Sequence, residues 1–303
     1  MFSKAKIEPR SYLVSLDLID AYTDFILSRQ AINCTPATLD FYRNTAGAFL
    51  SWIEKQGVTR PEEVTARFIC QYLSELVSSG KKDTTLHAHA RAIRTLVRFW
   101  HSEGYMPQLV KFEMPKLAKK RLPVLTANEL QRVIKSCNVR DKALVLFMAD
   151  SGLRRQETIN LNWSDVNMAN GLIRVKQGKG RKDRASVIGV TTRRALLKYK
   201  RTVDHSDNMP LFQSRTRERF TGTGLLLIYR RLSKRTGIHV TPHAMRRTFA
   251  ILSLRAGMSP LHLQSLGGWT DLTMVDHYAQ MVDDDLLQAH KQHSPIDNLL
   301  RLK

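Results

Sequence analysis

The sequence predicts a mainly helical protein of two domains, with one small β-hairpin in the second domain. Apolar residues recur at helical spacing over most of the chain, and two short β-branched runs flank a basic turn that contains glycine. A basic segment with two prolines, 111–123, divides the chain. At 303 residues, of which 43% are hydrophobic, the chain is long enough to build a core in each domain.

The charge of the chain indicates a polyanionic partner. Lys and Arg number 48 against 27 Asp and Glu, which gives a formal net charge of +21. Such an excess draws a protein to nucleic acid with a strong dependence on salt. Charge indicates binding but not catalysis, and it fits a non-catalytic ribosomal, chromatin or repressor protein equally well.

Cysteine usage and the first residues indicate the compartment. Cys34, Cys70 and Cys137 are widely separated and form no CxxC or Cys/His pattern, so we expect neither a disulfide framework nor a metal site. The chain has no apolar signal core and no apolar run of about 20 residues that would cross a membrane. We therefore expect a cytoplasmic protein, associated with the nucleoid if its partner is DNA.

The first domain, residues 1–110, is expected to contain four helices. Thr35 and Pro36 provide a cap and a first-turn proline, and Gly57, Gly80 and Gly104 mark helix ends. The expected helices cover about 16–30, 36–57, 65–79 and 84–104.

The fourth of these helices has one apolar stripe and one basic stripe. Arg91, Arg94 and Arg98 lie opposite the apolar stripe, and no acidic residue is interleaved with them. A basic stripe is often just a solvated face. The absence of acidic residues favours the hypothesis that these three arginines contact a DNA backbone or groove.

Residues 111–123 are interpreted as a linker between the domains. Lys119, Lys120 and Arg121 could bind phosphates while the two domains clasp a duplex, and a plain flexible tether is an equal alternative. The capping-box pattern from Thr126 to Glu129 then begins the second domain, residues 124–282.

The second domain is predicted to be helical around one hairpin. Residues 171–176 and 185–190 are expected to be strands, with a basic tip between them. Residues 283–303 form a tail with a short apolar helical pattern. The helices are expected at about 191–203, 222–236, 242–256, 260–266 and 271–281.

The candidate chemistry lies in this domain. Arg154 and Arg246, with His243, could hold a phosphodiester and stabilise the charge that develops on it, and the phenol of Tyr278 could attack it. Each residue alone has an ordinary explanation: an ion-paired arginine, a helix-capping histidine, a core tyrosine. Their combination in this order indicates DNA cleavage and rejoining.

Four segments carry a family resemblance. The chain resembles the tyrosine recombinases of the phage-integrase and Xer type, and the likeness covers nearly its whole length. It implies a two-domain clamp in which the first domain is a core-binding domain. The segments are 149–161 (ADSGLRRQETINL), 178–184 (GKGRKDR), 241–250 (TPHAMRRTFA) and 266–278 (LGGWTDLTMVDHY).

The resemblance implies a role for each site residue. Arg154 and Arg246 would grip the scissile phosphate, and Tyr278 would form a 3′-phosphotyrosyl link. Lys179 matches the lysine that protonates the leaving 5′-hydroxyl, with Lys176 and Lys182 as alternatives. His243 would assist removal of the phenolic proton, and Trp269, where the family often has histidine, would donate its indole N–H to the phosphate. Glu157 would orient Arg154, and Arg247 would be a DNA or structural contact.

The resemblance also implies partners. We expect double-stranded DNA, a dimer on one site and a homotetramer on two duplexes, with the tail packing on a neighbouring subunit. No cofactor and no metal are expected, and a partner recombinase or accessory protein stays open. A mobile-element integrase is favoured, because the helices begin near residue 16 and leave no room for an arm-binding domain. Resolution of chromosome or plasmid dimers, a type IB topoisomerase and a non-catalytic DNA-binding protein are the alternatives.

Overall fold

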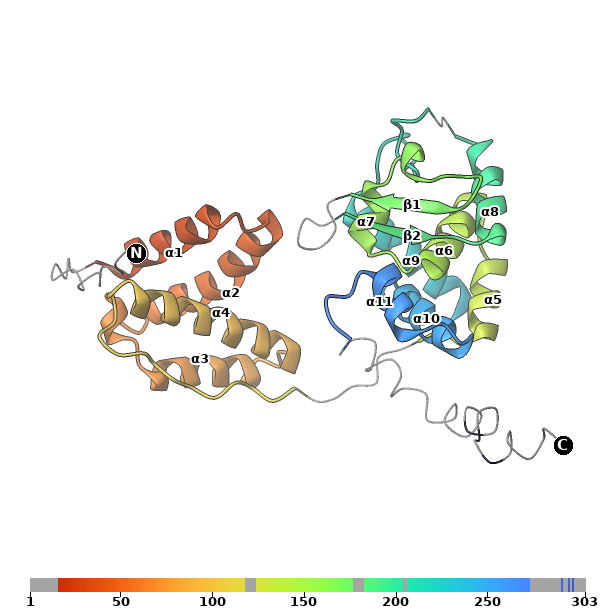
Figure 1. The fold of residues 1–303 in the computed structure, drawn as a ribbon. Helices are drawn as coiled ribbons and strands as arrows, with labels where there is room; N and C mark the ends of the chain where they lie inside the picture. Colours follow the sequence, from red (N-terminus) through yellow and green to blue (C-terminus); the bar gives the residue numbers. More distant parts are fainter. Residues whose placement is uncertain are drawn as a thin grey trace, which may run out of the picture. The chain divides into compact units, whose positions relative to one another are not determined.

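The computed structural model describes residues 16–117, 124–176, 183–203 and 206–272, together with residues 290, 294 and 296. The chain divides into two compact units, which we call unit 1 (residues 1–120) and unit 2 (residues 121–303). Among the described elements, unit 1 contains the first four α-helices, and unit 2 contains the later helices and the two strands (Figure 1). The described helices include none that is long and apolar enough to cross a membrane.

Unit 1 is a bundle of four α-helices, as the sequence predicts. Thr35 caps α2 through its hydroxyl, and Pro36 is the first residue of that helix. Trp100 is fully buried and donates its indole N–H to the Ala21 carbonyl at 3.0 Å, which ties α4 to α1. The elements are α1 (Leu18–Ala31), α2 (Pro36–Glu54), a 3-10 turn (Pro61–Glu63), α3 (Ala66–Ser78) and α4 (Asp83–Ser102).

Unit 2 is built around α6 (Val139–Ser151), which packs against both α8 (Val190–Lys200) and α10 (Pro242–Arg255). The predicted hairpin is present as β1 (Leu172–Val175) and β2 (Arg184–Val187), paired antiparallel. The remaining elements are α5 (Ala127–Lys135), α7 (Arg155–Asn160), a 3-10 turn (Trp163–Asp165), α9 (Gly222–Thr236) and α11 (Pro260–Gly267).

Three contacts in unit 2 determine where the site forms. The end of α6 leads through Gly152, in a left-handed conformation, directly into α7. A Cβ on Gly152 would collide with the Phe249 ring, so the end of α6 and α10 approach too closely for any other residue. β2 contacts α11, and α11 contacts α10, so the hairpin, α7, α10 and α11 converge (Figure 1).

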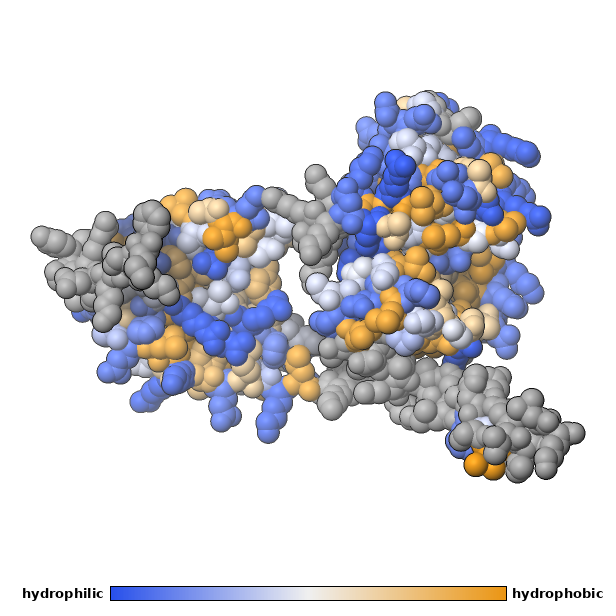
Figure 2. All heavy atoms as spheres, in the orientation of Figure 1, coloured by the Kyte–Doolittle hydropathy of each residue, from blue (hydrophilic) through white to orange (hydrophobic). Residues whose placement is uncertain are grey.

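Most helix ends agree with the sequence, and some differ by a few residues. The second helix ends at Glu54 rather than Gly57, because 55–57 form a turn that closes on Gly57. Residues 201–203 are likewise a turn beyond α8. The helix expected over 271–281 and the helical pattern in the tail fall largely outside the described residues. Hydrophilic and hydrophobic side chains both reach the surface of each unit (Figure 2).

Candidate active site

Two arginines from different elements form the centre of the site. Arg154 occupies the N-cap position immediately before α7, and its side chain is 26% exposed. Arg246 lies in the second turn of α10 and is 5% exposed. Arginine is rarely buried without partners, so the groups that hold these two side chains define the site.

The end of α11 supplies most of those partners. Arg184, Arg246 and Arg154 donate in turn to the carbonyl oxygens of three consecutive residues, 266, 267 and 268, at 2.5, 2.7 and 2.6 Å. The last carbonyls of a helix lack partners within the helix and carry the negative end of its dipole. The α11 end therefore holds three guanidiniums close together; we call residues 266–268 the carbonyl turn.

Glu157 supplies the negative charge of the cluster. Its carboxylate accepts hydrogen bonds from the Arg154 backbone N–H at 2.7 Å, from Arg154 Nη1 at 2.8 Å and from Arg184 Nη2 at 2.8 Å. Burial raises the pKa of this carboxyl, but the charge of Arg184 and the hydrogen bonds and charge of Arg154 outweigh burial. The pKa therefore lies below its usual value, and Glu157 is ionised at neutral pH.

Trp269 fixes Arg246 from another side. The Arg246 guanidinium lies 4.2 Å from the centroid of the Trp269 ring, and Trp269 is 9% exposed. Arg246 Nη1 also donates to the Gly152 carbonyl. These contacts fix the position of the Arg246 guanidinium, whose planar group of five N–H donors is suited to binding a phosphate.

His243 lies at the second position of α10, exposed to solvent beside the arginines. Partial loss of hydration lowers its pKa, and the positive charges of Arg247, Arg155, Arg246 and Arg154 lower it further. The imidazole is therefore neutral at neutral pH and able to accept a proton. Its position next to the arginines agrees with the proximity that the sequence predicts.

Arg184 is a member of the cluster that the sequence analysis did not single out. It is the first residue of β2 and the last of the basic run at 178–184. Its two hydrogen bonds, to the Leu266 carbonyl and to Glu157, connect the hairpin to the carbonyl turn. The basic run marks it as a candidate, but sequence alone does not separate it from its exposed neighbours.

Several predicted residues are not placed. Tyr278, Lys179, Lys182 and the linker cations Lys119, Lys120 and Arg121 lie outside the described residues. Lys176, one alternative for the leaving-group lysine, is described, and its Nζ lies 2.7 Å from the Asp165 carboxylate. That ion pair makes Lys176 the weaker alternative.

The predicted DNA contacts of unit 1 share a face of α4. Arg91 and Arg98 are exposed and Arg94 is partly exposed, while the Arg91 guanidinium lies 4.9 Å from the Phe41 centroid. Arg247 of unit 2 is partly exposed next to Arg246. Among the described residues no cluster of three or more His, Cys, Asp or Glu could hold a metal ion.

Comparisons with known proteins show which family the chain belongs to. The profile of the phage integrase family matches residues 123–284. The tyrosine recombinase XerA of Pyrococcus horikoshii is 30% identical over 241 residues, which are 78% of this chain and 83% of that protein. In unit 2, two arginines, a histidine and a buried tryptophan lie around the end of one helix. The protein that carries them is a tyrosine recombinase, an enzyme that cleaves and rejoins DNA at specific sites.

The chain belongs to the phage integrase family. Two solved structures share its fold. A lambda integrase tetramer bound to a Holliday junction has a TM-score of 0.72 at 19% identity, over 88% of this chain and 78% of that one. The Tn1549 transposon integrase in complex with a circular intermediate DNA has a TM-score of 0.73 at 16% identity, over 87% and 95%.

Proposed function

We propose that this recombinase cleaves DNA through a 3′-phosphotyrosyl intermediate formed by Tyr278. The phenolic oxygen attacks the phosphorus, the bond to the 5′-oxygen breaks, and a 5′-hydroxyl from a partner strand later reverses the step. The phosphotyrosyl ester conserves the bond energy, so rejoining needs no external energy source. The observation that carries the proposal is the carbonyl turn, because it holds Arg154 and Arg246 close together before any substrate is bound.

The roles proposed for the other groups are those that the family resemblance implies. Arg154 and Arg246 bind the nonbridging oxygens, and Trp269 packs against Arg246 and donates its indole N–H to the phosphate. The neutral His243 accepts the phenolic proton, and Lys179 gives a proton to the leaving 5′-oxygen. Glu157 orients Arg154, and Arg247 contacts DNA.

The proposed partner is double-stranded DNA, bound by a dimer at one site and by a homotetramer on two duplexes. The net charge of +21 supports DNA binding, and a neighbour of the same fold is a tetramer on a Holliday junction. Residues 1–110 would bind the core site, 111–123 would link the units, and 283–303 would pack on the next subunit. The cytoplasm, next to the nucleoid, would be its location.

Integration of a mobile element is the proposed biological role, and the transposon integrase of the same fold supports it. Resolution of chromosome or plasmid dimers is the second candidate, because the tyrosine recombinase XerA of Pyrococcus horikoshii is 30% identical to this chain. The two roles use the same chemistry. They differ in the DNA sites that are joined, and either role could involve a partner recombinase.

A suicide substrate tests the cleavage chemistry. Wild-type protein is incubated with nicked duplexes that carry its candidate site, and a DNA-linked species is sought on a denaturing gel. We expect an adduct that Tyr278→Phe abolishes while DNA binding is retained. Tyr42→Phe, which removes a phenolic oxygen from unit 1, is the matched control and should form the adduct normally. An adduct with Tyr278→Phe would contradict the assignment of the nucleophile.

A further inference from the structure

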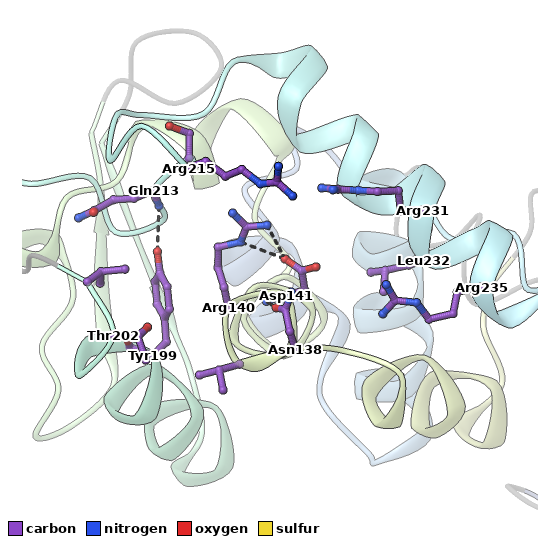
Figure 3. A pocket seen from close by; sticks show the side chains of 13 residues that line it. Asn138, Arg140, Asp141, Tyr199, Thr202, Gln213, Arg215, Arg231, Leu232 and Arg235 are labelled. Atoms are coloured by element: carbon purple, nitrogen blue, oxygen red, sulfur yellow. Dashed lines mark hydrogen bonds and ion pairs between the residues drawn. The ribbon is translucent and has the colours of Figure 1, made fainter.

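A second group of arginines surrounds a hollow in unit 2, apart from the cluster at the carbonyl turn. The hollow has a volume of about 590 Å³ and lies between the start of α6, residues 213–215 and α9. Four arginines line it: Arg140, Arg215, Arg231 and Arg235 (Figure 3). They come from three separate stretches of the chain, so the fold brings them together.

The positive charge of this hollow is not balanced by its lining. The one carboxylate among the lining residues is Asp141, which is 6% exposed and accepts from Arg140 Nε and Nη2, both at 3.0 Å. Arg140 also lies over the Phe220 ring, and Arg235 donates to the Ser136 carbonyl at 2.6 Å. One ion pair and one carbonyl therefore leave an excess of positive charge facing the hollow.

Arg215 and Arg231 are the two members free to bind a ligand. Both are exposed, and their guanidiniums point toward one another across the hollow (Figure 3). Within the described part of the chain neither side chain has a hydrogen bond or an ion pair. Like charges that face each other repel, and an anion bound between them offsets this repulsion because it attracts both. Planar guanidiniums suit a phosphate in particular.

A neighbouring hollow extends this site. It has a volume of about 480 Å³ and shares Arg140, Arg215 and Arg231 with the first. Its lining adds Arg230 and Lys234 and contains no carboxylate. The cations thus form a series over two adjoining hollows, which fits a chain of phosphates better than a single small anion.

Helix α9 connects these hollows to the active site. A methyl group on Gly222, the first residue of α9, would lie 3.5 Å from Cζ of Arg155, whose charge acts on His243. Arg231 follows nine residues later on the same helix, which is about 14 Å at 1.5 Å per residue. A DNA strand advances about 3.4 Å along the helix axis per phosphate, so about four phosphates cover that distance.

We propose that the hollow between α6, residues 213–215 and α9 is a second phosphate-binding site, in which Arg215 and Arg231 hold the backbone of the duplex beside the point of cleavage. This inference rests on the proposed function, because it takes DNA as the substrate. The site would fix the flank of the duplex while Arg154 and Arg246 act on the scissile phosphate.

The test is the salt dependence of duplex binding by the double variant Arg215→Gln, Arg231→Gln. Each phosphate contact contributes about 0.9 to the slope of log K against log salt concentration, so the slope should fall by about 1.8. The matched control is Lys198→Gln, Arg201→Gln, which removes two exposed cations of α8 and its end that line neither hollow. The slope of log K against log salt concentration should fall by less in the control than in the Arg215/Arg231 variant. The melting temperatures of both double variants should equal that of the wild type.

Two further measurements separate the possible outcomes. Equal slopes for wild type and the Arg215/Arg231 variant would overturn the site, whether or not wild type forms the Tyr278 adduct. A reduced slope without any adduct would support the site and contradict the proposed cleavage. Pyrophosphate is the small-anion probe: if it raises the melting temperature of wild type but not of the variant, and the slopes are equal, the site binds a free phosphorylated ligand and the DNA assignment is wrong.

Discussion

The arginines of α4 in unit 1 and those at the carbonyl turn in unit 2 differ in how they are held. Arg91 and Arg98 are exposed, and Arg91 rests on the face of an aromatic ring. Arg154 and Arg246 are held by backbone carbonyls at 2.6 and 2.7 Å. An exposed arginine loses side-chain freedom when it binds a phosphate, whereas a fixed one has already lost it.

This difference separates affinity from catalysis. A mobile cation follows the backbone of many sequences and contributes attraction that salt screens. A fixed guanidinium meets the charge that develops on the phosphorus without reorganising, which lowers the barrier to cleavage. Substitutions in the two groups should therefore change different measurements.

The largest effect is expected for Arg246→Lys. Lysine keeps the charge but cannot reproduce the two carbonyl contacts and the stacking on Trp269 together with a phosphate contact. The single-turnover rate of adduct formation at saturating protein should fall roughly 10³-fold, about 4 kcal/mol. Arg98→Lys is the control and should cleave at the wild-type rate. A rate within a factor of ten for a folded Arg246→Lys protein would contradict the comparison.

Glu157→Gln should reduce stability. Its carboxylate is 8% exposed and faces Arg154 and Arg184, so neutralising it leaves two guanidiniums without their counter-ion. We expect the free energy of unfolding in urea to fall by about 3 kcal/mol at pH 7. Because the folded-state pKa is lowered, this contribution is present above the unfolded value of about 4.3 and is lost as the pH falls below it.

The difference between wild type and Glu157→Gln should therefore shrink in acid. Glu129→Gln, which removes the negative charge from the exposed capping box of α5, is the matched control. It should cost no more than about 1 kcal/mol. A Glu157→Gln protein as stable as the control at pH 7 would show that the buried carboxylate does not bind the arginines together.

Arg94→Gln, Arg98→Gln should weaken duplex binding about tenfold at physiological salt and flatten its salt dependence. Since these side chains lie on α4, the rate of adduct formation at saturating protein should not change. Lys55→Gln, at the end of α2, gives the control for loss of an exposed charge in unit 1. A change in the saturated rate would mean that α4 acts in the chemical step as well.

The smallest effect concerns the acid limb of the pH–rate profile. The lowered pKa of His243 keeps the imidazole neutral below its usual value of about 6.5, which extends cleavage to more acidic solution. Arg155→Gln removes one of the charges that lower this pKa, so the acid limb should move to higher pH. Arg155→Lys keeps the charge and should leave the limb in place, and equal limbs in both variants would contradict the role of His243.

The starts of α2 and α5 were predictable from the sequence, whereas α6 was not, although Asn138 caps it. Thr35-Pro36 and Thr126 with Glu129 mark the starts of α2 and α5. In α6, Ala143 to Val145 and Phe147 to Met148 are buried on several sides of the helix. A helix that is apolar nearly all round shows little helical periodicity, so the pattern that reveals an amphipathic helix is absent.

Only the side chains of the site could be predicted from the sequence, and not the backbone groups that hold them. Arg154, Glu157, His243 and Arg246 were identified in advance, and the structure brings them together. The groups that hold the arginines are backbone carbonyls, and because every residue has one, the sequence contains no sign of them. Arg184 was missed for this reason, since its importance lies in a contact with the Leu266 carbonyl.

The carbonyl turn also affects how the protein tolerates mutation. Changing the side chain of Leu266 leaves its carbonyl in place, so drift at that position does not remove the anchor of Arg184. Gly267 and Gly268 are different, because a Cβ would collide with Trp269 at the first and with Arg184 at the second. Substitutions that would disturb the arginine cluster therefore include those at two glycines that contribute backbone carbonyls but no side chain.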